Sequence, residues 1–257
     1  MNDSTTHQGT ARQEAWGDAR GLRVVVTGGS AGLGLGLARG YAAAGARVVA
    51  IARNRERLER ALAGSGVLPL AADVSEKRAI HRISAEVIEV LGGVDVLIHN
   101  ASSLGPAPLK TLLETECEEV EEALQTNVLG PFRLTRALLG HTLAHGRGAT
   151  VVTLSSDAAV NPYPSWGAYS LSKAALDQMT RIWGRELVEQ GVRFVAVDPG
   201  DMATALHFAA LPDADPDGLL DPEEVARELI GFIGRYGAAA PGSAPARFSA
   251  DAWRAWA

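Results

Sequence analysis

The sequence predicts a single α/β domain of three layers, with a doubly wound parallel β-sheet between two layers of helices. Its 257 residues suit one large domain. Short apolar runs alternate with longer helical stretches, an order that produces parallel strands joined by right-handed crossovers. The apolar runs are continuous rather than alternating, which is typical of strands buried on both faces of a sheet.

The strands are expected where β-branched and other apolar residues cluster. In chain order these runs are L-R-V-V-V-T (22–27), R-V-V-A-I-A (47–52), V-L-P-L-A (67–71), V-D-V-L-I-H (94–99), A-T-V-V-T-L-S (149–155) and V-R-F-V-A-V-D (192–198). The helices between and after them are expected near 33–45, 54–63, 76–91, 116–145 and 166–190. A seventh strand of only a few residues is expected around Ala246 to Ser249. Because no repeat or linker divides the chain, residues 20–257 are expected to form one domain.

Composition and charge exclude several classes of protein. The formal net charge is -6 and the pI about 5.5, without a basic stripe, which argues against nucleic acid or an anionic membrane as the partner. Residues 1–19 are polar and are expected to form a disordered leader rather than a secretory signal. Since no run of about 20 apolar residues exists, a soluble cytoplasmic protein is expected. The single cysteine, Cys117, lies among acidic residues that disfavour its thiolate and is interpreted as a bystander.

A glycine-rich turn follows the first expected strand. It reads T-G-G-S-A-G-L-G (27–34), and it places Gly28, Gly32 and Gly34 between a strand and a helix. Glycines let the backbone turn tightly and approach an anion, and the N-terminus of the next helix offers free N–H groups to a pyrophosphate. The turn therefore predicts a dinucleotide site and a Rossmann-like fold, although glycine also serves ordinary turns.

The end of the second expected strand indicates which dinucleotide binds. An NAD site usually carries an acidic residue there to hold the ribose 2′-hydroxyl, whereas this chain has Ala52, followed by Arg53 and Arg55. Arginine grips a phosphate through paired hydrogen bonds, so NADP(H) is favoured over NAD. The alternative is that these arginines simply lie on a solvated helix start.

Tyr169 and Lys173 stand out in the stretch W-G-A-Y-S-L-S-K-A-A-L (166–176). Positions four apart share one face of a helix, so a phenol and an ammonium group are expected side by side. Ser156 follows the fifth strand, at the carboxyl edge where doubly wound folds bind ligands. A hydroxyl, a phenol and an ammonium group are therefore expected to converge near the predicted dinucleotide.

This ordered series resembles the short-chain dehydrogenase/reductase family. The resemblance covers about residues 20–235 and rests on T-G-G-S-A-G-L-G, Asp73, H-N-A-S (99–102), N-V-L-G (127–130), Ser156, Y-S-L-S-K (169–173) and P-G-D-M-A-T (199–204). It implies that Tyr169 is the general acid, and that Lys173 holds the nicotinamide ribose and, with oxidised nicotinamide, lowers the pKa of the phenol. It also implies that Ser156 hydrogen-bonds the substrate oxygen and that Asn127 holds a water that relays protons. Each of these four side chains has a plainer interpretation as a structural or surface residue.

The resemblance implies a set of cofactor contacts along the carboxyl edge of the sheet. The expected contacts are Gly28, Ser30, Gly32, Leu33, Gly34, Arg53, Arg55, Asp73, Val74, Asn100, Ala101, Tyr169, Lys173, Pro199, Gly200, Met202 and Thr204. The chain departs from the N-N-A-G segment common in the family, because His99 stands at its first position and Ser102 at its last. His99 is interpreted as a buried strand-end residue, and Ser102 is expected to alter the backbone and the pocket mouth.

Residues 213–224 read D-A-D-P-D-G-L-L-D-P-E-E and match the pattern of an EF-hand calcium loop. A simpler interpretation is that Asp221 caps a helix, Pro222 is its first residue and Glu224 closes a capping box. On that interpretation no metal is bound, and the segment is a lid beside the substrate pocket. The first interpretation is kept as an alternative.

The substrate pocket is expected to draw on the loops after strands four, five and six. Its candidate residues are Leu104, Pro106, Tyr163, Trp166, Met202, His207 and Phe208. They are mostly apolar, so a hydrophobic or aromatic carbonyl compound is expected, and S-S-D-A…S-W-G-A-Y resembles the sepiapterin- and benzil-reductase-like branch of the family.

The sequence thus predicts an NADP(H)-dependent carbonyl reductase that acts on a small carbonyl or alcohol substrate. The resemblance implies a homodimer or homotetramer, formed through the helices expected at 116–145 and 166–190. Two alternatives are open. The protein could be a non-catalytic dinucleotide-binding sensor or scaffold, or it could use the same residues for epimerisation or dehydration.

Overall fold

A parallel sheet of seven strands forms the centre of the molecule, in a computed structural model that describes residues 18–239 and 246–256. The strands are β1 (Arg23–Thr27), β2 (Arg47–Ala52), β3 (Leu68–Ala71), β4 (Val96–His99), β5 (Ala149–Leu154), β6 (Val192–Val197) and β7 (Arg247–Phe248). Their order across the sheet is β3-β2-β1-β4-β5-β6-β7. The order reverses between β1 and β4, which is the point at which doubly wound sheets bind ligands. The predicted fold class is confirmed.

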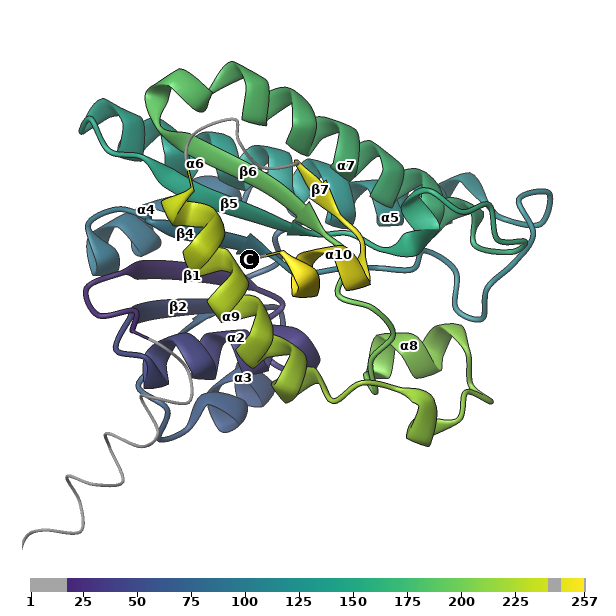
Figure 1. Ribbon diagram of the computed structural model, residues 1–257. Coiled ribbons are helices and arrows are strands. Elements are labelled where there is room, and N and C mark those ends of the chain that lie inside the picture. The colour runs from purple at the N-terminus through teal and green to yellow at the C-terminus, as the bar shows by residue number, and fades with distance from the viewer. Residues whose placement is uncertain (1–17, 240–245, 257) are drawn as a thin grey trace, which may run out of the picture.

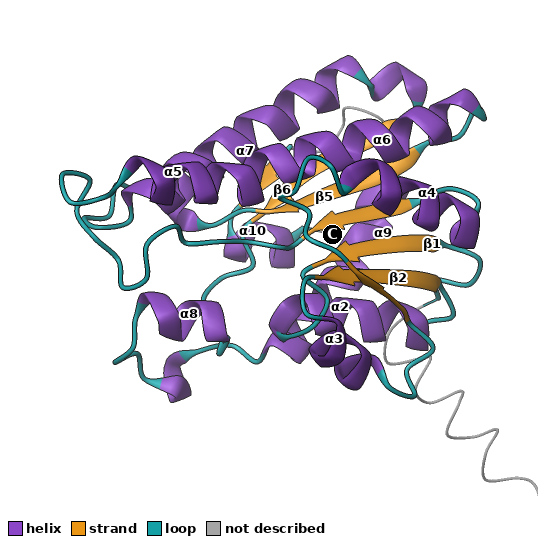
Figure 2. Ribbon diagram, turned by 180° about the vertical axis from the view of Figure 1, so that it is seen from behind, coloured by secondary structure: helices purple, strands orange, loops and turns teal. Residues whose placement is uncertain are grey.

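Helices cover both faces of the sheet, as Figures 1 and 2 show from opposite sides. One layer contains α2 (Gly32–Ala43), α3 (Arg55–Leu62), α9 (Pro222–Ala238) and α10 (Ala250–Ala255). The other contains α4 (Ile80–Leu91), α6 (Gly130–Ala144) and α7 (Gly167–Glu186), with α5 (Cys117–Leu124) leading into α6. The short helix α8 (Ala205–Ala210) lies apart from both layers, in the connection that follows β6 (Figure 1).

The strand sequences explain the two cores. Successive residues of a strand point to opposite faces, so Val24 and Val26 of β1 pack with one helix layer and Val25 packs with the other. In α4, the buried residues Ile80 and Ile83 recur with helical spacing toward the second layer. Burying one such side chain stabilises the fold by about 1.5–3 kcal/mol. The continuous apolar runs in the sequence are therefore the inner strands of a sheet covered on both sides.

Two of the expected helices are divided differently in the structure. The stretch expected at 116–145 is α5 and α6, separated by a π-helical turn at Gln125–Leu129. The stretch expected at 166–190 ends its α-helix at Glu186, and a 3₁₀ turn then closes at Gly191, whose φ is 76°. The helix expected from residue 76 begins at Ile80. The expected short seventh strand is confirmed as β7.

The expected leader is mostly outside the described residues, since residues 1–17 are not among them. Of its last two residues, Ala19 is buried, and its N–H donates a hydrogen bond to the Ala44 carbonyl at 2.9 Å. Ala19 is thus part of the packed domain.

The acidic segment 213–224 ends in a helix cap. Asp221 is the N-cap of α9, and its carboxylate accepts a hydrogen bond from Glu223 N at 2.9 Å, while Pro222 is the first helical residue. Asp215 caps a 3₁₀ turn in the same way, accepting from Asp217 N at 3.1 Å. Within residues 18–239 and 246–256, no group of three or more His, Cys, Asp or Glu side chains is arranged to hold a metal ion. The helix-capping interpretation therefore describes Asp221 and Pro222 correctly, whereas the capping box expected from Glu224 is not formed among the described residues.

None of the helices in the described part of the chain has the length and apolar character needed to span a bilayer.

Candidate active site

The turn after β1 is tied directly to the end of β4. The hydroxyl oxygen of Thr27 accepts hydrogen bonds from Asn100 N at 3.0 Å and from Ala101 N at 3.1 Å. The Asn100 side-chain amide donates to the Thr27 carbonyl at 3.0 Å. Gly28 has a φ of 72°, and a Cβ on it would lie 2.7 Å from the Asn100 amide nitrogen. A glycine is therefore required at this position, both by its φ and by the close approach of Asn100.

The N-terminus of α2 is suited to an anion. Gly32, its first residue, has a φ of 52°, and a Cβ there would lie 3.2 Å from the Thr204 methyl carbon. The N-cap residue, Ala31, makes no side-chain cap, and the first turn of this fully described helix contains no acidic residue. The free N–H groups and the positive end of the helix dipole are thus available to a phosphate. These residues fit the pyrophosphate of a dinucleotide.

A cavity of about 440 Å³ lies beside this turn, at the ends of β2 and β3. Its lining includes most of the contacts expected for the adenosine half of the cofactor, namely Gly28, Ser30, Arg53, Asp73, Val74 and Ala101. Arg57, which sequence reasoning missed, also lines it. Arg55 does not, because its guanidinium pairs with Glu59 at 3.2 Å along the exposed side of α3. Arg53 precedes the helix cap Asn54 and Arg57 lies in the first turn of α3, so the cluster of arginines around this helix start is the signal that could have identified Arg57.

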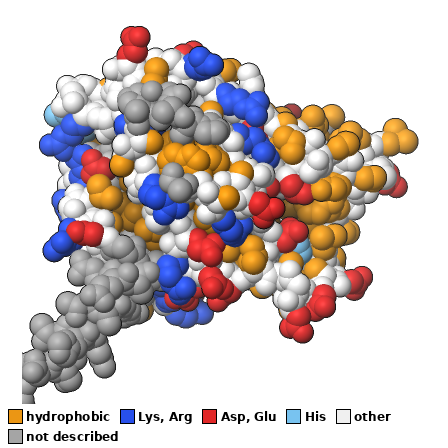
Figure 3. Space-filling view, in the orientation of Figure 1, with side chains coloured by type: hydrophobic (Ala, Val, Ile, Leu, Met, Phe, Trp, Pro, Cys, Tyr) orange, Lys and Arg blue, Asp and Glu red, His pale blue; other side chains and the backbone are white. Residues whose placement is uncertain are grey.

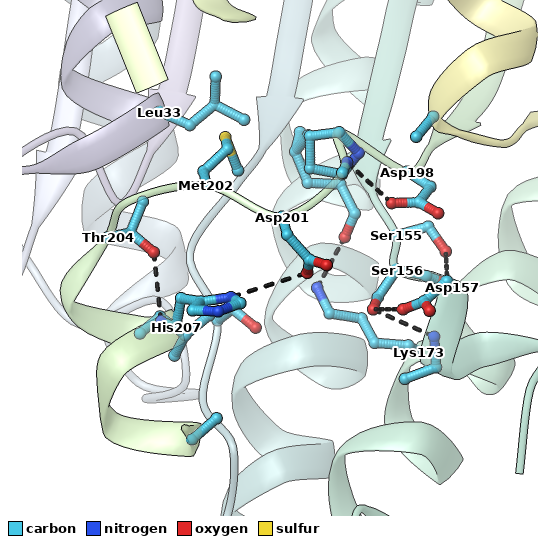
Figure 4. A pocket seen from close by; sticks show the side chains of 18 of the residues that line it. Leu33, Ser155, Ser156, Asp157, Lys173, Asp198, Asp201, Met202, Thr204 and His207 are labelled. Atoms are coloured by element: carbon cyan, nitrogen blue, oxygen red, sulfur yellow. Dashed lines mark hydrogen bonds and ion pairs between the residues drawn. The ribbon is translucent and has the colours of Figure 1, made fainter. Parts of the chain in front are cut away.

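A second cavity, of about 740 Å³, opens at the carboxyl ends of β5 and β6 (Figure 4). Ser156, Tyr169 and Lys173 all line it, so the structure brings together the three polar groups that the sequence singled out. Other expected residues that line it are Leu33, Asn100, Leu104, Tyr163, Trp166, Pro199, Gly200, Met202, Thr204 and His207. Of the expected pocket residues, Pro106 and Phe208 are not part of this lining.

Ser156 lies at the carboxyl end of β5 with its hydroxyl already engaged. Its oxygen accepts a hydrogen bond from Ala158 N at 3.2 Å, and the hydroxyl donates to the Asp157 carboxylate at 3.1 Å. The hydroxyl of Tyr163 donates to the other Asp157 oxygen at 2.6 Å. Asp157, which the sequence analysis did not single out, thus orients two hydroxyl groups of the cavity.

Tyr169 and Lys173 lie on the same face of α7, as predicted from their spacing. The Lys173 ammonium nitrogen is 5.4 Å from the centre of the Tyr169 ring. It donates a hydrogen bond to the Leu154 carbonyl at 2.7 Å. Both side chains are buried, with Tyr169 7% and Lys173 3% exposed. A phenol and an ammonium group are therefore held close together in a site largely shielded from water.

The pKa of Tyr169 is raised in the protein without bound cofactor. Burial of the phenol raises its pKa to about 12, and the hydroxyl groups of Ser156 and Ser102 oppose this rise. The carboxylates of Asp198 and Asp157 add to it. Lys173 is not among the groups that shift this pKa, and the lowering expected in the presence of oxidised nicotinamide stays a prediction. Without bound cofactor the phenol is protonated at neutral pH.

Burial has the opposite effect on the ammonium group. It lowers the pKa of Lys173 to about 8, and the nearby carboxylates of Asp177 and Asp198 limit the decrease. Near neutral pH the ammonium form therefore still predominates. At neutral pH the site therefore holds the Lys173 cation close to the protonated Tyr169 phenol.

Asn127 lies in the π-helical turn, behind the cavity rather than in its wall. Its side-chain oxygen accepts from Ser103 N at 2.8 Å. Its nitrogen donates to the Ser103 carbonyl at 2.7 Å and to the Ser172 hydroxyl at 2.8 Å. This amide joins the loop after β4 to the helix that carries Tyr169. The water-holding role expected for Asn127 stays a prediction.

Two residues of the H-N-A-S segment behave differently from each other. His99 is buried, its Nε2 lies 2.7 Å from the Thr135 hydroxyl, and burial lowers its pKa to about 3. Its interpretation as a buried strand-end residue is confirmed. The hydroxyl oxygen of Ser102 is buried and forms no hydrogen bond of normal geometry among the described residues, although it lies near enough to the Tyr169 phenol to affect its pKa, and the residue lines both cavities.

Hydrophobic side chains gather on the surface beside α8, a helix that contributes to the wall of the larger cavity. In Figure 3, hydrophobic side chains gather between α8 and the loops that project to the right in Figure 1, with acidic groups at the border. Leu206, His207 and Ala210 of α8 contribute to the wall of the cavity. An organic molecule with an apolar body would be shielded from water on this face.

A doubly wound parallel sheet with a glycine turn at its switch point, and with Ser156, Tyr169 and Lys173 beside that turn, defines the class of nucleotide-dependent oxidoreductases. The chain belongs to the short-chain dehydrogenase family, whose family model, described as "short chain dehydrogenase", matches residues 23–214. The expected family is thus confirmed, and with it an enzyme that catalyses oxidation or reduction. The more specific likeness to the sepiapterin- and benzil-reductase-like branch stays a prediction.

Individual relatives agree with this family. The chain is 35% identical to a short chain dehydrogenase of Pseudocercospora fijiensis over 216 residues, which are 80% of this chain and 67% of that protein. It is 30% identical to a 3β-hydroxysteroid dehydrogenase of Eggerthella lenta over 225 residues, covering 84% and 83% of the two chains. A solved metagenomic short-chain oxidoreductase in complex with NADP is 27% identical, with a TM-score of 0.72 and coverage of 90% and 96%.

Proposed function

We propose that the protein is an NADP(H)-dependent carbonyl reductase that uses Tyr169 as its general acid. The observation that carries this proposal is the convergence of Tyr169, Lys173 and Ser156 on one cavity, next to the glycine turn. A protonated phenol, a nearby cation and a hydroxyl group are the groups that reduction of a carbonyl needs.

The choice of NADP(H) rests on the smaller cavity. Ala52 stands where an acid would favour NAD, and the guanidinium groups of Arg53 and Arg57 belong to the same wall. Two cations suit a 2′-phosphate, which a carboxylate would repel. The relative solved in complex with NADP supports the same choice. When bound, NADPH supplies the hydride that reaches the carbonyl carbon.

The protein's own residues then handle the proton and the charge on oxygen. As the carbonyl oxygen gains negative charge, Tyr169 donates its phenolic proton to it, so that the product is an alcohol. Ser156 stabilises the same oxygen once its hydroxyl turns from Asp157 toward the substrate. Lys173 lies close enough to stabilise the phenolate that the proton transfer leaves behind. Because the Tyr169 pKa is about 12, the proton-donating form is available throughout the neutral range.

The cavity wall supports a hydrophobic substrate. Leu104, Trp166 and Met202 line the larger cavity, and Trp166 packs edge-on against Tyr169 with ring centres 5.8 Å apart. Such a wall would hold an apolar ketone or diketone with its carbonyl toward the phenol.

The proposal is tested by following nicotinamide absorbance with a panel of ketones and α-diketones, using NADPH and NADH in parallel. We expect turnover with NADPH, and we expect Tyr169→Phe to reduce kcat by at least about a hundredfold while NADPH still binds. Tyr236→Phe is the matched control, because it also removes a buried phenolic hydroxyl, which donates to the Phe194 carbonyl at 2.9 Å, from a residue that lines neither cavity, and it should retain most of the activity.

Two results would contradict the proposal. Cofactor binding without turnover, unchanged in Tyr169→Phe, would favour a dinucleotide-binding sensor or scaffold. A converted substrate with no net change in NADPH would favour epimerisation or dehydration.

We also propose a cytoplasmic homo-oligomer, as the family resemblance implies.

A further inference from the structure

A buried ion pair lies behind the catalytic groups and joins α7 to β7. The guanidinium of Arg247 donates through Nε to a carboxylate oxygen of Asp177 at 2.7 Å, and the two side chains are only 13% and 5% exposed. Neither residue is among the described residues that line the cavity. Neither belongs to the motifs that identify the family. The pair is therefore placed to act on the site from behind, without touching a substrate.

The arginine also holds the backbone of Ser156. Its Nη2 donates to the Ser156 carbonyl at 3.1 Å, while Nε remains with Asp177. Arg247 reaches this carbonyl from β7, which pairs with β6 on the side away from β5. A guanidinium is a planar fork of donors, so it can fix two acceptors in one geometry, which a lysine cannot do. The position of Ser156 thus depends on a residue from the last strand of the sheet.

The Asp177 carboxylate acts on the Lys173 ammonium group, which is the cation of the proposed site. Asp177 follows Lys173 by four positions in α7, so both lie on one face of the helix. Its second oxygen, Oδ1, is buried and has no hydrogen-bond partner within the described residues. The charge groups around Lys173 are Asp177 on its own helix, Asp198 after β6 and, through the ion pair, Arg247 of β7. Asp177 therefore favours the charged form of Lys173, and the pairing of its carboxylate with the Arg247 cation limits this effect.

Stability alone does not account for such a pair. Removing two charges from water is costly, and an apolar pair of similar volume often stabilises a fold as well or better. The unpartnered oxygen of Asp177 adds to that cost, because a buried acceptor without a hydrogen bond loses its hydration.

We propose that Asp177 and Arg247 are a positioning pair, in which Arg247 fixes the backbone at Ser156 and Asp177 maintains the positive charge of Lys173. This inference rests on the proposed function. It adds to that function two residues that touch neither substrate nor cofactor, and it makes the short strand β7 a part of the catalytic apparatus.

The first test measures Lys173 directly in the protein without cofactor or substrate. The sequence contains no lysine other than Lys77, Lys110 and Lys173, so NMR of protein labelled with ¹³C-lysine resolves each ammonium during a pH titration. We expect Asp177→Asn to lower the Lys173 midpoint and Arg247→Met to raise it, each by about one pH unit. Asp95→Asn is the matched control, because it neutralises the acid of another shielded ion pair, with Arg23, at the opposite end of the strands.

The two variants should displace the Lys173 midpoint in opposite directions. Partial unfolding or increased flexibility would not produce such a result. A Lys173 midpoint that is the same in both variants as in the wild type would overturn the electrostatic half of the proposal. Because this experiment needs no turnover, it remains informative even if the reductase assignment fails.

The second test addresses Ser156. Asp177→Leu combined with Arg247→Met replaces the pair by apolar side chains, so the variant avoids leaving one charge buried alone. We expect kcat to fall about tenfold to a hundredfold, because Ser156 is no longer held in place, while the dissociation constant for NADPH changes less than about twofold. Arg247→Lys keeps the charge without the fork, and should leave the Lys173 midpoint near the wild-type value but still lower kcat.

A folded double variant with wild-type kcat would show that the pair is structural only and would overturn the positioning role. A double variant that loses NADPH binding in proportion to kcat would overturn it as well. If no variant or wild type turns over any substrate, the proposed function fails, whereas the lysine titration still decides the electrostatic half.

Discussion

Arg53 and Arg55 show how two arginines only two positions apart can have unlike surroundings. Arg53 lines the smaller cavity, whereas Arg55 pairs with Glu59 on the surface of α3. A hydrogen bond to a charged group contributes about 1.5–3 kcal/mol, which corresponds to about tenfold to a hundredfold in affinity. We therefore expect Arg53→Ala to weaken NADPH binding by that factor and NADH binding by less than about threefold, as measured by fluorescence titration.

Arg55→Ala is the control for this experiment, since it removes the same charge from a position two residues away. It should leave both dissociation constants within about twofold, because an exposed ion pair contributes little. Equal losses of NADPH and NADH in Arg53→Ala would refute the assignment of Arg53 to the 2′-phosphate.

His99 makes the stability of the fold depend on pH. Burial lowers its pKa from 6.5 to about 3, so between these values the unfolded chain binds a proton that the folded protein does not. Stability is then fully present above pH 6.5 and declines as the pH falls toward 3, by up to about 1.4 kcal/mol per pH unit. In urea unfolding at pH 6 and pH 5, the wild type should lose about 1 kcal/mol more than His99→Asn. Equal losses would show that His99 does not cause the decline.

At the scale of the elements, the close packing of α2 against α9 depends on one glycine, Gly36. A Cβ on Gly36 of α2 would lie 2.9 Å from the Ala226 Cβ of α9, and 3.3 Å from the Pro222 carbonyl oxygen. We expect Gly36→Ala to lower the free energy of unfolding by about 1–3 kcal/mol, because the helices must move apart.

Gly140→Ala provides the opposite result in the same assay. Gly140 lies inside α6, and a Cβ there meets no atom within 4 Å. Alanine in a helix interior is favoured over glycine by about 0.5–1 kcal/mol, so this substitution should stabilise the protein. Thermal unfolding in which both substitutions act in the same direction would refute the packing argument.

The elements themselves were largely predictable from the sequence, whereas their interruptions were not. A strand such as β5 is uniformly apolar, and burial on two faces leaves few other conformations for such a run. The π-helical turn at Gln125–Leu129 could not be predicted, because one extra residue in a turn does not disturb an apolar pattern enough to be detected. Arg55 was misplaced for a similar reason, since sequence gives the spacing of a helix start but not its rotation about its axis.

At the scale of the whole molecule, the homo-oligomer that we propose would need an exposed apolar surface for its interface. Ile182 is 47% exposed on α7, on one of the two stretches through which a homo-oligomer is expected. If α7 forms that interface, Ile182→Asp should convert the oligomer to a monomer in light scattering, because a carboxylate would be buried unpaired. Val90→Asp, at a similarly exposed residue of α4, should leave the mass unchanged. A wild-type protein that is already monomeric would refute the expected homo-oligomer.

The grouping of the candidate site residues was predictable from the sequence, but their electrostatics were not. Tyr169, Lys173 and Ser156 follow from motif and strand order, and the structure brings them together. The high pKa of Tyr169 depends on burial, with a contribution from Asp198 beyond β6, and such long-range neighbours are not visible from local spacing. The same is true of Arg247, which lies far along the chain from Ser156 and yet holds its carbonyl.

The π-helical turn at Gln125–Leu129 also determines where the chain tolerates the loss of a residue. Deleting one codon within it would leave an uninterrupted α-helix, which is a more regular structure. Because the π-helical turn accommodates its extra residue locally, α5 and α6 would keep their positions, whereas residues within the turn would shift, so the Asn127 amide would lose Ser103 or Ser172. Deletions at this point should yield well-folded but inactive proteins, and natural variation in length should fall elsewhere.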